Sequence, residues 1–169
     1  MHTLFIQQGQ GVVVDGDVQI TTATLYNCSV IAGFDPGSGR CGAYHLSSMR
    51  INEAAVRSEL REFLRVLAPT RVFLVHALDH GMVGAGSPRE DREGLMAWAR
   101  GATHIKPAVA YSASPVCLSA GGVFVMGERQ EIAAFDYKAP TLSLETAIAG
   151  PYEWKGCQFT LIGVSREPR

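Results

Sequence analysis

The sequence predicts an α/β (α+β) fold, a layered sandwich in which two main helices cover a mixed, largely antiparallel sheet. Three observations predict it. Many short apolar segments lie between turn residues, which is typical of strands. Two longer segments repeat their apolar residues at helical spacing. The first strands are joined by short turns, which favour hairpins and therefore antiparallel pairing.

The first expected strand covers residues 2–8, and two short strands flank an Asp15–Gly16 turn within residues 12–20. Asp-Gly favours a hairpin because both residue types tolerate positive φ. Later strands are expected near residues 71–78, 104–111, 116–118, 122–127, 131–137 and 157–164.

Two helices are expected. The first begins near Asn52, a residue type that caps helix N-termini, and it ends at Pro69. Its buried face consists of Val56, Leu60, Phe63, Leu64 and Leu67, which recur at helical spacing. The second follows the capping box Ser87–Glu90 and ends near Arg100. Its inward residues are Leu95, Trp98 and Ala99.

The composition indicates a globular, soluble protein. At 169 residues, the chain is long enough for a substantial core, and we expect one domain over residues 1–169. The net charge of −1 provides no basic surface for nucleic acid. No apolar run reaches the length of a membrane span, and residues 1–8 do not resemble a signal peptide. We therefore expect a cytoplasmic protein, although export as an effector by specialised machinery stays open.

We expect neither a cofactor nor a metal. The four cysteines, Cys28, Cys41, Cys117 and Cys157, lack the spacing of a metal site. His76 and His80 have a spacing that brings imidazoles together on a helix, but here a strand end and a glycine-rich loop carry them. These two histidines are better placed to line a pocket rim.

Cys28 and His45 are the leading candidates for chemistry. They flank a hairpin with strands near 28–34 and 41–47, and Asp35–Ser38 has the residues of a tight turn. A two-residue loop would place Cys28 directly opposite His45, whereas a four-residue loop, residues 36–39, would make them diagonal neighbours. In both registers the thiol and the imidazole share a face, because side chains alternate along strands. The two-residue register also argues against a Cys28–Cys41 disulfide, because it separates these residues along the sheet.

The residues around this pair resemble a known family. Thr22 lies six residues before Cys28, and Leu25 lies three before it, while Gly42 precedes His45. This pattern resembles the CheD chemoreceptor glutamine deamidases and the toxin glutamine deamidases that are similar to the Burkholderia lethal factor and the cytotoxic necrotizing factors. The resemblance covers about a third of the chain, before residue 50.

Two positions depart from the family pattern. Tyr26–Asn27 stand where the CheD motif has Gly-Ser, and Cys41 replaces the first glycine of its Gly-Gly pair. The first change alters the backbone freedom next to the nucleophile, so whether the site remains active is left open.

The resemblance implies cysteine-dependent deamidation of an exposed glutamine on a protein substrate, giving glutamate through a thioester. Cys28 would be the nucleophile and His45 the general base. Thr22 would bind His45 and set its tautomer, with Thr21 and Thr24 as neighbouring candidates for that role. Two other readings stay open: a non-catalytic protein-binding module on the same fold, and a cysteine protease or transglutaminase-like acyltransferase. The sequence indicates neither the substrate's identity, nor a chemotaxis or toxin role, nor the oligomeric state.

Overall fold

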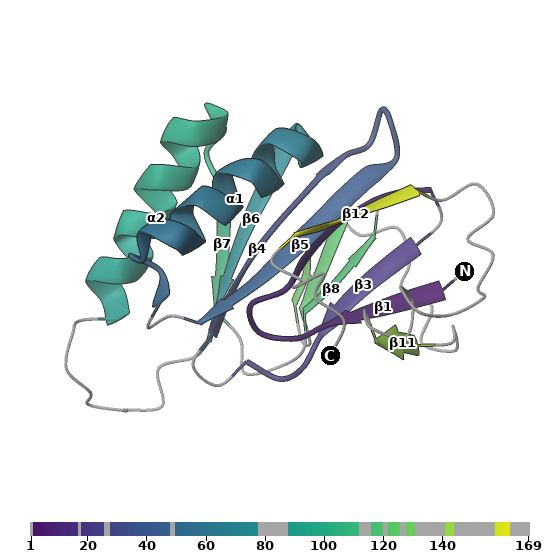
Figure 1. Cartoon of the computed structure of the whole chain (residues 1–169), viewed down its shortest axis with the longest axis horizontal. Helices are drawn as coiled ribbons and strands as arrows, with labels where there is room; N and C mark the ends of the chain where they lie inside the picture. Colours follow the sequence, from purple (N-terminus) through teal and green to yellow (C-terminus); the bar gives the residue numbers. More distant parts are fainter. Residues whose placement is uncertain are drawn as a thin grey trace.

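Two six-stranded sheets and two helices form the described part of the protein, a computed structural model (Figure 1). The structure describes residues 2–16, 18–25, 28–47, 50–77, 88–111, 116–119, 122–125, 128–130, 141–143 and 158–162. The strands are β1 (His2–Ile6), β2 (Gly11–Asp15), β3 (Val18–Thr22), β4 (Cys28–Asp35), β5 (Arg40–Ser47), β6 (Arg71–His76), β7 (Ala108–Tyr111), β8 (Val116–Ser119), β9 (Gly122–Val125), β10 (Glu128–Gln130), β11 (Thr141–Ser143) and β12 (Gln158–Ile162). The helices are α1 (Ala54–Leu67) and α2 (Pro88–Thr103).

The strands divide between sheet A, with the order β10-β9-β8-β3-β1-β11, and sheet B, with the order β12-β2-β5-β4-β6-β7. Strand β1 pairs in parallel with both β3 and β11, and β6 pairs in parallel with β7, whereas the other pairs are antiparallel. The predicted layered α+β fold with mixed, largely antiparallel pairing is confirmed. The strands form two such sheets.

Two apolar layers hold the fold together. Leu4 and Ile20 of sheet A pack with Val30 and Phe34 of sheet B in a core between the sheets. On the other face of sheet B, residues such as Ile31 pack against the helices. The helices lie outside sheet B, so the order of layers is helices, sheet B, sheet A (Figure 1). Sheet B is therefore buried on both faces.

The Asp15–Gly16 turn is a corner between the sheets and not the expected hairpin. Strand β2 before it belongs to sheet B, and strand β3 after it belongs to sheet A. Gly16 adopts a φ of 105°, which a glycine tolerates and which redirects the chain. Val14 and Val18 on either side both face the core between the sheets. The corner thus buries Val14 and Val18 in the same layer.

Helix α1 has the predicted buried face, made of Val56, Leu60, Phe63, Leu64 and Leu67. Its N-cap is Glu53 and not Asn52, whose Oδ1 instead accepts a hydrogen bond from Arg57 Nη2 at 3.2 Å. The helix ends at Leu67, and its C-cap Ala68 has a φ of 44° and donates its N–H to the Leu64 carbonyl at 2.9 Å. Proline at the next position prevents the helix from continuing.

Helix α2 extends to Thr103, beyond the expected end near Arg100, so the next strand begins at Ala108 and not at residue 104. Leu95 and Ala99 are fully buried, as predicted, and Trp98 is half-buried. The expected strand at 131–137 and the capping residue Ser87 lie outside the described residues. Strand β11 was not predicted.

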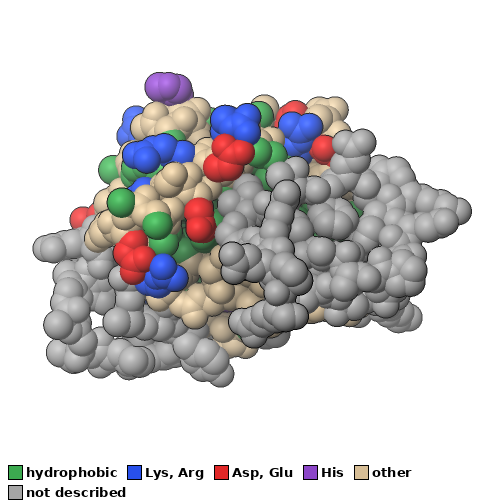
Figure 2. Space-filling model, in the orientation of Figure 1, with side chains coloured by type: hydrophobic (Ala, Val, Ile, Leu, Met, Phe, Trp, Pro, Cys, Tyr) green, Lys and Arg blue, Asp and Glu red, His purple; other side chains and the backbone are tan. Residues whose placement is uncertain are grey.

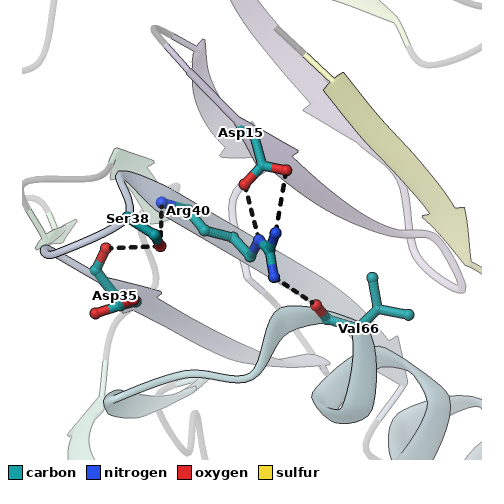
Figure 3. Close-up of polar contacts among 5 residues, drawn as sticks. All are labelled: Asp15, Asp35, Ser38, Arg40 and Val66. Atoms are coloured by element: carbon teal, nitrogen blue, oxygen red, sulfur yellow. Dashed lines mark hydrogen bonds and ion pairs between the residues drawn. The ribbon is translucent and has the colours of Figure 1, made fainter.

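Arg40 fastens the turn end of the β4–β5 hairpin to its neighbours (Figure 3). Its Nε lies 2.7 Å from an Asp15 carboxylate oxygen, and its Nη1 donates to the Val66 carbonyl at 3.4 Å. Strand β5, strand β2 and helix α1 therefore meet at one side chain. Within the turn, the Arg40 N–H donates to Ser38 Oγ, which donates to the Asp35 carbonyl.

Candidate active site

The β4–β5 hairpin places Cys28 and His45 on one face of sheet B. Cys28 pairs with Ser47, and Val30 pairs with His45, which is the register of the four-residue loop. The alternative in which Cys28 lies directly opposite His45 is wrong. Gly39 explains the outcome, because it takes the positive φ of 74° that closes the longer loop, and its N–H donates to the Asp35 carbonyl at 3.0 Å.

The two residues are diagonal neighbours across the strand pair. In this geometry their Cβ atoms lie about 7 Å apart, a separation that long side chains and rings can span. His45 is 4% exposed, whereas Cys28 is half-buried and packs against the core between the sheets. Backbone hydrogen bonds fix the position of both residues. The Ala77 N–H donates to the Cys28 carbonyl at 3.0 Å, and the Gly9 N–H donates to the His45 carbonyl at 2.7 Å.

The imidazole of His45 has the protonation state of a general base. Its Nδ1 lies 3.5 Å from the Ile6 carbonyl oxygen of sheet A. A carbonyl only accepts, so Nδ1 carries the proton and Nε2 carries the lone pair. Nε2 is buried and has no hydrogen-bond partner within the described residues. Burial lowers the pKa of His45 below its ordinary value of 6.5, and the Ile6 carbonyl offsets this only in part, so the ring is neutral at neutral pH.

Thr22 does not make the predicted hydrogen bond to His45. Its hydroxyl donates to the Ala23 carbonyl at 2.8 Å and accepts from Val116 N–H at 3.1 Å. The side chain thus joins β3 to the start of β8. Thr21, a neighbouring candidate, contacts Cys117 Sγ at 3.3 Å. The Ile6 carbonyl, a backbone group that no sequence motif marks, occupies the orienting position instead.

Two further residues of the predicted motif have clear packing roles. Leu25 is fully buried in the core between the sheets. A Cβ at Gly42 would lie 2.9 Å from the Val12 carbonyl oxygen and 3.1 Å from the Phe63 ring. Only glycine therefore lets α1 pack this closely on β5. Tyr26 and Asn27, where the chain departs from the family pattern, lie outside the described residues.

Cys28 differs from the other described cysteines in exposure. Cys41 lies opposite Phe34, far along β4 from Cys28, so the register keeps their sulfurs apart. Burial, with a smaller contribution from Asp15, raises the pKa of Cys41 to about 12. Burial also raises the pKa of Cys117, and the Thr21 hydroxyl offsets this in part. Within the described residues, Cys28 is the one thiol that is not buried; Cys157 lies outside them.

A second polar pair, Ser29 and His76, lies on the opposite face of sheet B. Ser29 Oγ is 2.7 Å from His76 Nδ1, and both side chains are at most 1% exposed. The His76 ring lies against Tyr111, with 5.6 Å between ring centroids. Sequence reasoning identified His76 only as a pocket-rim candidate and missed Ser29, because their contact depends on the β4–β6 register. The hydroxyl is too deeply buried for a substrate to reach it.

Two classes of site have no support in the described residues. No group of three or more His, Cys, Asp or Glu side chains there could hold a metal ion, and His80 lies outside them. In the same part of the chain, neither helix has the length and apolar character needed to cross a membrane. Figure 2 shows basic and acidic side chains interspersed over the described part of the visible face.

Neither the known protein families nor the curated protein sequences give a match to this chain.

Proposed function

We propose that the protein is a cysteine-dependent protein-glutamine deamidase, a hydrolase that converts an exposed glutamine side chain of a protein substrate to glutamate. One observation carries the proposal: a neutral, buried imidazole, whose Nε2 has no hydrogen-bond partner in the described part of the chain, lies on the same sheet face as the half-buried thiol of Cys28. A thiol with a neighbouring base is the minimum equipment for acyl chemistry at an amide.

The reaction needs only these groups and water. His45 Nε2 takes the proton of the Cys28 thiol, and the thiolate attacks the carboxamide carbon. The imidazolium then protonates the departing nitrogen, so ammonia leaves and a thioester remains. With the same imidazole as base, a water molecule attacks the thioester, which releases the glutamate side chain and restores the thiol. The two steps together consume one water molecule, release one ammonia molecule and return Cys28 and His45 to their starting protonation states, so no cofactor is needed.

A peptide library in which glutamine is flanked by every residue type tests this function. We expect mass spectrometry to show replacement of an amide NH2 by OH in a subset of peptides, and no change with Cys28→Ser. Cleaved peptides would indicate a protease, and incorporation of an added amine would indicate an acyltransferase. A library left unmodified by the intact protein would support the non-catalytic binding module. Each of these three results overturns the proposal.

A further inference from the structure

A polar pocket of about 360 Å³ lies between the start of α1 and the end of β5. This volume is within the range of small-molecule and side-chain sites. Its polar lining comes from Gln8, Tyr44, Ser47, Arg50 and Glu59, and its apolar lining includes Val56.

The pocket lies at the same end of the β4–β5 pair as Cys28, but on the helix-facing side of sheet B, because Tyr44 and Leu46 in its wall pack toward the helices. Ser47 in its wall is the register partner of Cys28, and directly opposed residues have Cα atoms about 5 Å apart. Gly9, also in the wall, donates its N–H to the His45 carbonyl. A protein substrate with its glutamine at Cys28 would therefore reach the pocket by passing around the end of these two strands.

The charged groups at the pocket leave a net negative charge, because the one guanidinium of Arg50 lies near two carboxylates, Glu53 and Glu59. Arg50 is engaged by Glu53, because its Nε and Nη2 donate to that carboxylate at 2.8–3.1 Å. Glu59 is half-buried, and no ion pair joins it to a basic side chain of the described residues. The Tyr44 hydroxyl donates to Glu59 Oε2. A carboxylate accepts at both oxygens, so Glu59 can also accept hydrogen bonds from a ligand in the pocket.

Tyr44 holds this carboxylate in place. The ring is 2% exposed and packs edge-on against Phe63, with 6.1 Å between ring centroids. Burial, followed by the hydrogen bond to Glu59, raises the pKa of Tyr44. The hydroxyl therefore stays protonated and remains a donor to the carboxylate at any physiological pH.

We propose that this pocket binds an arginine side chain of the protein substrate, at the same end of the β4–β5 pair as the glutamine that is deamidated. The position relative to the glutamine rests on the proposed function, but the binding itself does not. The guanidinium fork matches a carboxylate such as that of Glu59, and the apolar wall at Leu46 and Val56 suits the side chain's methylene stem.

Two small probes test the pocket without turnover. N-acetyl-arginine N-methylamide is compared with its citrulline counterpart, which has the same shape but no charge, by NMR titration of the Cys28→Ser protein. We expect shifts at the amides of Gly9 and Ser47, and about tenfold tighter binding of the arginine probe. Equal binding of the two probes would overturn the inference, as would tighter binding of N-acetyl-glutamate N-methylamide through Arg50.

Glu59→Gln is the matched variant, because its amide oxygen can still accept from Tyr44. We expect it to remove the preference for arginine over citrulline, while Glu62→Gln, an exposed change one turn along α1, keeps it. A preference that survives Glu59→Gln would count against the site. If Glu59→Gln does not fold, the comparison of the arginine and citrulline probes on the Cys28→Ser protein still tests whether the pocket prefers arginine. All of these experiments measure binding and not turnover. A negative binding result would therefore not contradict the proposed deamidation, and a negative deamidation assay would not contradict arginine binding in the pocket.

Discussion

The carbonyl oxygen of Ile6 and Nδ1 of His45 face each other at 3.5 Å across the two sheets. The group that orients the imidazole therefore comes from a different sheet than the imidazole itself. The Ile6 carbonyl is a hydrogen-bond acceptor without a net charge. It therefore selects the tautomer of His45, but it stabilises the protonated ring less strongly than a carboxylate would.

His45 gives the folded state a pH dependence. Its pKa is lowered in the folded protein because burial disfavours the charged ring. The unfolded chain then binds more protons than the folded chain below pH 6.5, so the stability from this group is present above 6.5 and is lost as pH falls through the folded pKa. We expect the urea midpoint to fall on acidification, less steeply in His45→Gln. Identical slopes in the two proteins would contradict this.

The three described cysteines are expected to differ sharply toward a thiol reagent at neutral pH. A pKa of about 12 gives Cys41 roughly a thousandfold smaller thiolate fraction than its ordinary value of 9.0 would. We expect iodoacetamide to label Cys28 at least about a hundredfold faster than Cys41 or Cys117, as measured by peptide mass spectrometry. His45→Gln should slow only the Cys28 reaction. Slow and equal labelling of all three would exclude activation of Cys28.

Thr22 is expected to matter for stability and not for thiol reactivity. Thr22→Val removes the acceptor of the Val116 N–H, which should cost about 1–3 kcal/mol of unfolding free energy. Thr22→Ser keeps the hydroxyl and serves as the control. Urea unfolding measures the cost, and the labelling rate of Cys28 should be the same in both variants. A slower rate in the valine variant alone would restore the orienting role that the sequence predicts.

Gly42 is expected to tolerate no side chain. A Cβ there would lie 2.9 Å from the Val12 carbonyl oxygen, so Gly42→Ala should destabilise the protein by about 1–3 kcal/mol. The matched change is Gly101→Ala on the exposed face of α2, where no atom lies within 4 Å of the added methyl. That change should stabilise the helix by up to about 1 kcal/mol. Thermal or urea unfolding of the pair compares the two environments directly.

The features predicted correctly are those that depend on local pattern. The buried face of α1 follows from five apolar residues at helical spacing, and that spacing does not depend on distant residues. The shared face of Cys28 and His45 is equally local, because both loop lengths considered for the hairpin are even.

The features missed depend on distant parts of the chain. Asp15–Gly16 suits a hairpin and a corner equally well, and the choice depends on which sheet offers a partner to β3. The Ile6 carbonyl, and not Thr22, orients His45. The Thr22 hydroxyl instead accepts a hydrogen bond from the N–H of Val116, at the start of β8. The pocket likewise combines the start of α1 with residues 8–9, whose proximity no motif encodes.

The position of β12 beside β2 has a consequence for synthesis of the protein. Strand β2 emerges early, but its outer partner comes from residues 158–162, where Phe159 pairs with Val14. Until that segment is made, β2 presents open backbone donors and acceptors at the rim of sheet B. Long-range pairs of this kind form slowly. The nascent chain therefore carries an exposed strand edge until residues 158–162 have been synthesised, and this is the stage at which a chaperone would be needed.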